Sequence, residues 1–243
     1  MKVFLSLMLA LMVGMVISTH ANSPHANSPL AKTVVEENDP QEVISRYIDA
    51  IGGKDKVAKI KNSVMFMEAE VQGMKIEIKG IADQENERFV QETSVMGNVA
   101  SRTVLANGKG KMVAMGQEQQ IPDEMISLMK TQTYVFPEDH YRDLGFTLEL
   151  QGTEDIEGEQ AHKLIITAPN GIKTVEYYSV RTNLKLRTSS EATGDITYSD
   201  YQEVDGVKIP KRMTIKNPMM PMALEAKVIS IHFNQPLSDD EFK

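Results

Sequence analysis

Three methionines near the carboxyl end of the sequence carry soft thioether groups that could do chemistry. Met219, Met220 and Met222 lie in the stretch NPMMPMALEAKVISIHFN, where two prolines remove backbone donors and discourage strand pairing. Thioethers select Cu(I), so these residues together with His232 could form a copper site. Methionine is also flexible and apolar, so the same residues could border an apolar cavity or fill a core. We favour the border of a cavity and predict no metal.

A second group of polar side chains could gather a divalent cation. The stretch PEDHYRD holds Glu138, Asp139, His140 and Asp143, and oxygen and imidazole groups are suitable ligands. A solvated loop explains the same residues more simply. We therefore predict that this stretch is a hydrated loop without a metal.

Side chains that could support catalysis are few. Tyr198, Asp200 and Tyr201 could act as acid and base, but a strand with its polar face in water accounts for them. No HExxH or HxxEH zinc helix occurs, and the few histidines are scattered. The G-x-S-x-G, P-loop and dinucleotide fingerprints are absent as well. The sequence therefore predicts no enzyme activity, no catalytic residue and no cofactor.

Methionines and aliphatic residues are spread along the rest of the chain. Such an adaptable apolar surface suits ligands of varied shape, but an ordinary hydrophobic core would use the same residues. Periodicity does not separate these two interpretations. The residues predicted to face a hydrophobic ligand are Met65, Met67, Met74, Ile76, Ile78, Met112, Met125, Leu128, Met129, Leu148 and Met213, together with Met219, Met220 and Met222.

The amino terminus has the pattern of a secretory signal peptide. Lys2 precedes an apolar run over residues 3–17, and the small residues Thr19 and Ala21 frame a cleavage site after Ala21. Residues 1–21 should therefore be removed on export to the periplasm. Residues 22–38, which include the repeat HANSPHANSP, should form a disordered linker. The chain has no cysteine, so we expect neither a lipid anchor nor a disulfide.

Charge and hydropathy exclude some classes of partner. The formal net charge is −8, and loss of Lys2 with the signal peptide makes it more negative. Nucleic acid and anionic lipid head groups are therefore poor partners. The apolar run at the amino terminus is shorter than the roughly 20 residues that a spanning helix needs, so we expect no membrane span.

The elements that must position these residues follow from the hydrophobic period. Residues 39–53 predict a helix, because Asp39 can cap it and Gly52 or Gly53 can end it. From Val64 the period changes to two, as in MKIEIKG, and short strands alternate with turn signals. One further short helix should begin at Asp123 or a neighbour, because Met125, Leu128 and Met129 follow at helical spacing. About twelve strands with two or three helices indicate a single α+β, mostly β domain over residues 39–243.

Several motifs resemble the LolA-like family of periplasmic carriers. They are YIDAIGGKDKVAKIKN (47–62), LANGKGKMVAMGQ (105–117), LELQGTEDIEGEQAHKLIITAPNGIKTVEYYSVRTNLKL (148–186) and YSDYQEVDGVKIPKRM (198–213). They are most similar to the Bacteroidota branch, which also occurs as the last domain of insulinase-type peptidases. The resemblance implies a curled antiparallel half-barrel of about 11–12 strands. It also implies that an amino-terminal helix and a short lid helix cover an apolar concave face suited to acyl chains.

Resemblance and sequence together predict an exported carrier or binding protein for lipid, lipoprotein acyl chains or another hydrophobic ligand. The alternative is a non-catalytic protein–protein module that assists a separately encoded peptidase, as the fused relatives suggest. An envelope protein could be a further partner.

Overall fold

The computed structural model describes residues 39–191, 193–217 and 222–243, apart from the side chains of Glu124 and Leu128. The predicted signal peptide, the predicted linker, Met219 and Met220 lie outside the described residues. Within the described part of the chain, no helix has both the length and the apolar character needed to cross a membrane.

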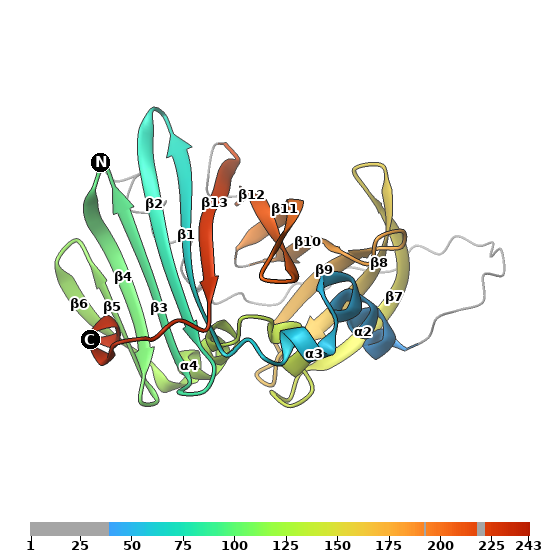
Figure 1. The fold of residues 1–243 in the computed structure, drawn as a ribbon, viewed down its shortest axis with the longest axis horizontal. Coiled ribbons are helices and arrows are strands. Elements are labelled where there is room, and N and C mark those ends of the chain that lie inside the picture. Colours follow the sequence, from blue (N-terminus) through green and yellow to red (C-terminus); the bar gives the residue numbers. More distant parts are fainter. Residues whose placement is uncertain (1–38, 192, 218–221) are drawn as a thin grey trace, which may run out of the picture.

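One antiparallel sheet of thirteen strands forms the body of the molecule (Figure 1). Two meanders, β1 to β6 and β7 to β13, join where β1 pairs with β13. Among the described strands, β6 and β7 are the two edges, so the sheet stays open. The strands are β1 (Asn62–Val71), β2 (Met74–Asp83), β3 (Arg88–Val95), β4 (Asn98–Ala106), β5 (Lys109–Ala114), β6 (Gln117–Ile121), β7 (Thr147–Ile156), β8 (Glu159–Thr167), β9 (Lys173–Ser179), β10 (Lys185–Ser190), β11 (Gly194–Val204), β12 (Val207–Lys216) and β13 (Leu224–Phe233).

The prediction of a mostly β chain is confirmed, with one strand more than expected. The extra strand is β6, whose sequence QEQQI has no alternation of apolar and polar residues. Its first four residues are exposed, because an edge strand beside a solvated surface buries little. Hydrophobic period therefore could not identify it.

Alternation along the strands separates two faces of the sheet. Met67 on β1 and Ile76 and Ile78 on β2 pack into the core cluster that contains helix α2 (Pro40–Ile51), and this face is called the inner face below. Lys75 lies on the opposite, outer face and pairs with Glu68 at 2.8 Å. The predicted alternation of MKIEIKG is therefore confirmed.

Helix α2 contacts β7 and β12 and covers part of the inner face (Figure 1). The Asp39 side chain accepts a hydrogen bond from the Gln41 backbone N–H at 2.9 Å, as expected of a cap. The helix ends at Gly52, where a Cβ atom would lie only 2.7 Å from the Gly206 carbonyl oxygen. Its buried side chains lie on one face and are Val43, Ile44, Tyr47, Ile48 and Ile51. A second short helix, α3 (Lys54–Val57), follows.

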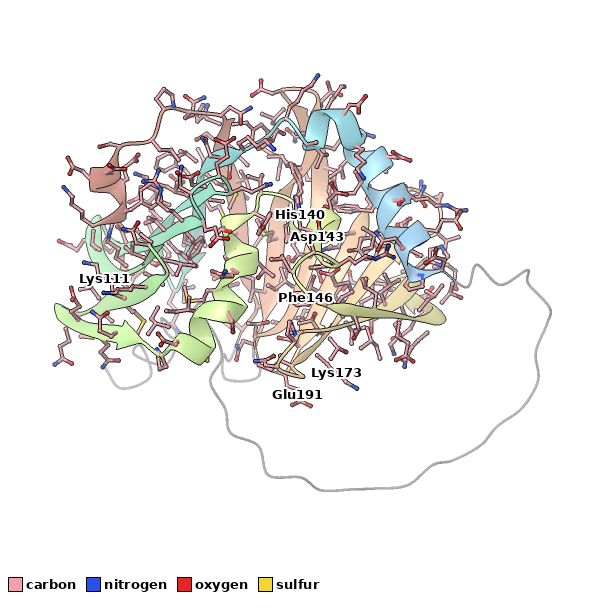
Figure 2. The ribbon with its side chains drawn as sticks, turned by 90° about the horizontal axis from the view of Figure 1, so that it is seen from below. Lys111, His140, Asp143, Phe146, Lys173 and Glu191 are labelled. Atoms are coloured by element: carbon pink, nitrogen blue, oxygen red, sulfur yellow. The ribbon has the colours of Figure 1, made fainter. Side chains whose placement is uncertain are left out.

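The segment between β6 and β7 crosses the inner side of the sheet (Figure 2). It contains α4 (Asp123–Met129) and the 3₁₀ turns η1 (Lys130–Thr133) and η2 (Pro137–His140). Ile126 and Met129 of α4 are buried against Leu105 of β4. The short helix predicted to begin at Asp123 or a neighbour therefore exists, and its movement as a lid stays a prediction.

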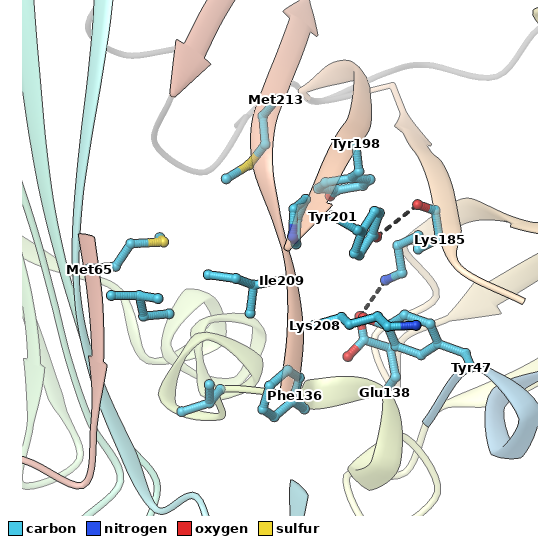
Figure 3. A pocket seen from close by; sticks show the side chains of 13 residues that line it. Tyr47, Met65, Phe136, Glu138, Lys185, Tyr198, Tyr201, Lys208, Ile209 and Met213 are labelled. Carbon is cyan, nitrogen blue, oxygen red and sulfur yellow. Dashed lines mark hydrogen bonds and ion pairs between the residues drawn. The ribbon is translucent and has the colours of Figure 1, made fainter. Parts of the chain in front are cut away.

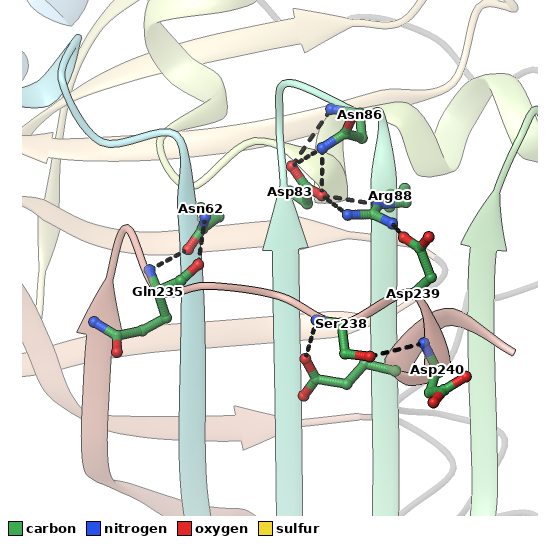
Figure 4. A network of polar contacts seen from close by, with 9 residues as sticks. Asn62, Asp83, Asn86, Arg88, Gln235, Ser238, Asp239 and Asp240 are labelled. Carbon is green, nitrogen blue, oxygen red and sulfur yellow. Dashed lines mark hydrogen bonds and ion pairs between the residues drawn. The ribbon is translucent and has the colours of Figure 1, made fainter.

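The carboxyl-terminal segment covers the outer face of β2, β3 and β4 (Figure 4). Phe242, in the 3₁₀ turn η3 (Asp239–Phe242), packs with Ile81, Val90 and Val104. Arg88 lies 2.6 Å from the Asp83 carboxylate and 2.7 Å from that of Asp239. The guanidinium also lies 4.0 Å from the centre of the Phe242 ring. These contacts attach the last residues to the sheet.

Candidate functional site

A cavity of about 170 Å³ lies on the inner face where the two meanders meet (Figure 3). Side chains from α2, β1, η2 and the strands β10 to β13 surround it. Its lining residues are Tyr47, Met65, Val135, Phe136, Glu138, Lys185, Tyr198, Tyr201, Lys208, Ile209, Pro210, Met213 and Ile231.

One wall of this cavity is apolar. Met65 on β1 pairs directly with Ile231 on β13, so both side chains reach the cavity from adjacent strands. Met213 and Ile209 on β12 extend this wall, and Phe136 closes it from the segment that crosses the inner face. This wall can bury an apolar group.

The opposite wall carries tyrosine hydroxyl groups. Tyr198 and Tyr201 are three positions apart on β11, and regular alternation would place them on opposite faces. Between them Asp200 has φ 55, a left-handed conformation that interrupts the alternation, and both tyrosines line the cavity. Tyr201 donates a hydrogen bond to the Lys185 carbonyl oxygen at 2.8 Å, and Tyr198 donates to Thr188 Oγ1 at 3.3 Å.

A buried ion cluster forms the polar end of the cavity. Lys185 Nζ lies 2.5 Å from Glu138 Oε1 and 2.6 Å from Glu176 Oε1. The hydroxyl groups of Tyr141 and Tyr178 donate to Glu176 at 2.9 and 2.5 Å. The side chains of Lys185 and Glu138 are each 8% exposed, and that of Glu176 is 4% exposed. The charges are thus stabilised by one another and by hydroxyl donors, with little help from water.

Burial and charge shift the pKa values of this cluster. Burial lowers the pKa of the Lys185 ammonium, but the two adjacent carboxylates outweigh it and hold this pKa well above its usual value. Burial, aided by the same carboxylates, raises the pKa of the hydroxyl groups of Tyr47, Tyr141 and Tyr178. At neutral pH the folded protein therefore holds a charged lysine and neutral tyrosines.

We expect the stability of the protein to fall as the pH rises above about 10. Below the unfolded pKa values both states keep these protons, so the stabilisation is fully present. Above those values the unfolded chain releases protons that the folded chain retains, so stabilisation is lost as the pH rises toward the folded pKa values. The midpoint of thermal unfolding should fall across this alkaline range. The fall should be less steep in Tyr178→Phe than in the control Tyr134→Phe. Identical profiles in all three proteins would contradict the assignment.

The stretch PEDHYRD is not the solvated loop that the sequence predicts. Glu138 is buried because Lys185, 47 residues further along the chain, neutralises it. The ring of His140 lies 4.4 Å from that of Tyr134, centre to centre. Asp143 follows on the same segment (Figure 2). Among the described residues no three His, Asp or Glu side chains converge to form a metal site.

The structure places the residues predicted to face a ligand in several environments. Two of them, Met65 and Met213, line the cavity. Met67, Ile76, Ile78 and Met129 are buried in the core, whereas Met74, Met112, Met125 and Leu148 are half-buried. The side chain of Leu128 lies outside the described part, as do Met219 and Met220, and Met222 is 70% exposed.

Of the residues that could form a copper site, the structure describes Met222 and His232, and these two lie far apart. Met222 precedes the first residue of β13, whereas His232 lies near the end of the same strand. At about 3.3 Å per residue, the strand separates them by more than about 25 Å. Met222 and His232 therefore cannot bind the same ion.

Exposed methionines gather at one end of the sheet. The hairpins β1–β2, β3–β4 and β5–β6 all turn at this end, and β13 begins beside it because Ala69 pairs with Ala226. Met96 and Met115 occupy the β3–β4 and β5–β6 turns with φ 51, and are 63% and 71% exposed. With Met222 they form what is called the methionine rim below.

Tyr47, Glu176 and Lys185 are not among the residues predicted from the sequence. For Glu176 a signal exists in KTVEYYSV, because alternation places this carboxylate on the same face as Tyr178. A charged residue on an apolar face of a strand indicates a buried partner.

No family model matches the sequence, and no curated protein matches it closely enough to count as a relative. Solved structures do match the fold. A DUF1329 family protein from Desulfovibrio piger has 14% identity and a TM-score of 0.55, over 84% of this chain and 98% of its own. A LolA superfamily protein from Nitrosomonas europaea has 10% identity and a TM-score of 0.56, over 84% and 97%.

A third structure is described as an outer-membrane lipoprotein-sorting protein domain from Vibrio parahaemolyticus. It has 13% identity and a TM-score of 0.53, over 84% of this chain and 97% of its own. These likenesses show that the chain has the LolA-like fold. At such low identity they concern the fold alone.

Proposed function

We propose that this LolA-like chain is an exported carrier or binding protein for a hydrophobic molecule, and that the cavity between Met65 and Tyr201 holds one end of that molecule. The observation that supports this function most is the arrangement of an apolar wall and a polar end around one half-open cavity. Binding sites for small molecules share this combination. The signal-peptide pattern over residues 1–21 supports export, with cleavage after Ala21.

The size of the cavity limits what it can hold without rearrangement. Its volume of about 170 Å³ is close to that of a cavity that binds benzene, about 150 Å³, and is below the roughly 300–1,000 Å³ of drug-sized sites. About six methylene groups would contribute on the order of 5 kcal/mol before the costs of binding. A longer chain must therefore continue outside the cavity.

The inner face offers a route for such a chain. Along β1 the apolar side chains of Met65, Met67 and Val71 lead from the cavity toward the methionine rim, and Val71 pairs with Met74 at its end. Flexible thioethers at the rim would suit a mobile aliphatic chain. We propose this rim as the entrance and the segment carrying α4 as the movable cover. Met219 and Met220 stay predicted members of the entrance.

Filling the cavity with a larger side chain tests the proposal. Met213→Trp places a bulky ring against the apolar wall, and we expect it to weaken binding of the neutral fluorescent probe N-phenyl-1-naphthylamine by about tenfold or more, a loss of about 1.4 kcal/mol. The matched control is Val180→Trp, at a residue that is 46% exposed and does not line the cavity. Equal probe affinity in both variants, with both folded, would argue against the cavity as the binding site.

The alternative of a module that assists a peptidase rests on the sequence resemblance alone. No contact among the described residues favours it.

A further inference from the structure

The polar end of the cavity contains a hydrogen-bond acceptor without a donor. Glu138 Oε1 accepts from Lys185, whereas Glu138 Oε2 has no hydrogen-bond partner among the described residues. The side chain is only 8% exposed, and Glu138 lines the cavity. Figure 3 shows one carboxylate oxygen joined to Lys185 and the other turned away from the ammonium. Carboxylate oxygens with little access to water normally have a donor, and a molecule that fills this space can supply one.

We propose that this cavity selects hydrophobic molecules whose head group donates a hydrogen bond and carries no negative charge, as the hydroxyl or amine end of an alkyl chain does. This inference rests on the proposed function and narrows its ligand class. The head group would lie at Glu138, with the first carbons of the chain along Ile209, Met213 and Met65.

The charges around the cavity disfavour an anionic head group. One ammonium, that of Lys185, already faces the two carboxylates of Glu138 and Glu176. A ligand carboxylate would be the third negative charge beside this single buried cation. Lys208 also lines the cavity, but its side chain is exposed, and water screens an exposed charge strongly. The local balance therefore favours neutral or cationic head groups.

The same cluster can complete the hydrogen bonds of a hydroxyl group. An ammonium has three N–H donors, and Lys185 uses two of them for the carboxylates. Tyr201 donates its proton to the Lys185 carbonyl oxygen, so the lone pairs of its hydroxyl oxygen can accept. A ligand hydroxyl could thus donate to Glu138 Oε2 and accept from Lys185. An ether or a carboxylate offers no proton and would leave the Glu138 oxygen unpaired.

Displacement of bound N-phenyl-1-naphthylamine by matched alkyl compounds tests this selectivity. In the wild-type protein we expect octan-1-ol and octylamine to displace the probe at concentrations at least about tenfold lower than octanoate does. Heptyl methyl ether isolates the effect of the missing donor. It should be weaker than octan-1-ol, although it is less polar. Displacement by octanoate or by the ether as effective as by octan-1-ol would overturn the proposal.

Glu138→Gln separates recognition by the protein from the different hydration of the compounds in water. The amide keeps the shape and removes the charge, and Lys185 retains its pair with Glu176. The ratio of the octanoate concentration to the octan-1-ol concentration that displaces the probe should fall at least about fivefold in this variant. The same ratio should stay unchanged in the control Glu154→Gln, which alters an exposed ion pair with Lys163. An unchanged ratio in folded Glu138→Gln would overturn the proposal. If that variant fails to unfold cooperatively, the ether comparison in the wild type decides.

Binding of a hydrophobic molecule and selection of its head group can be contradicted separately. Absence of probe binding by the wild-type protein would contradict the proposed function itself. Probe binding without discrimination among the four head groups would contradict only the head-group assignment.

Discussion

Lys185→Met is expected to lower the free energy of unfolding by about 3–5 kcal/mol, because the change leaves two buried carboxylates without their cation. The Lys185 ammonium lies within 2.6 Å of both Glu138 and Glu176, and the three side chains are at most 8% exposed. Removing the positive charge converts an attraction into repulsion between two carboxylates in a poorly hydrated site. Chemical denaturation at neutral pH measures the loss.

The matched control is Lys163→Met on β8, which is separated from β10 by β9. Lys163 pairs with Glu154 at 2.9 Å, but the two side chains are 29% and 46% exposed. Exposed pairs contribute at most about 1 kcal/mol, so this variant should differ little from the wild type. A second check is the triple variant Lys185→Met, Glu138→Gln, Glu176→Gln, which removes all three charges and should recover part of the loss. Similar losses for the two single lysine variants would show that the cluster is not a strongly coupled unit.

Phe242→Ala is expected to cost about 3 kcal/mol of unfolding free energy, within the range for deleting a buried phenylalanine. The ring is 7% exposed and closes the outer cluster formed by Ile81, Val90 and Val104. Its loss also removes the contact with the Arg88 guanidinium. Because the segment is held by few elements, we expect faster hydrogen exchange in β3 and β4 as well.

Phe66→Ala is the control for this second variant. Phe66 is 42% exposed, and the centre of its ring lies 6.0 Å from the Lys79 ammonium. Like Phe242 it therefore has a cationic partner, but it is not packed in a buried cluster. Its replacement should cost less than about 1 kcal/mol. Equal costs at both positions would mean that the carboxyl-terminal segment contributes no more than an exposed ring does.

The fold could be predicted from local patterns to a large extent. Strands that bury one face show it as alternation, as Met74, Ile76 and Ile78 do on β2, and the capped helix begins at the predicted residue. β6 gave no such signal because an exposed edge strand needs no apolar side. The LolA-like resemblance rests on glycine turns and core residues, and Gly108 and Gly206 do lie in the β4–β5 and β11–β12 turns with positive φ.

The site was harder to predict, because irregular backbone creates it. In NLKLRTSS the alternation suggests that Leu184 and Leu186 share a face and that Lys185 faces water. The register between β9 and β10 shifts between Lys185 and Arg187, so Leu186 packs against Ile156, Ala161 and Tyr177 while Lys185 turns inward. The left-handed Asp200 has a similar effect on Tyr201. The alternation of apolar and polar residues does not indicate where such single-residue irregularities occur.

Crystallography with 6-bromohexan-1-ol tests the central claim, that the cavity holds an apolar chain, most directly. Bromine gives an anomalous signal that identifies one atom of the ligand without reference to the shape of the density. The cavity walls place that atom beside Met65 and Met213, with the hydroxyl group toward Glu138. We expect one strong peak at that position, absent from crystals of Met213→Trp treated in the same way. Bromine found only on the outer face of the sheet, or equally in the wild type and the variant, would contradict the account.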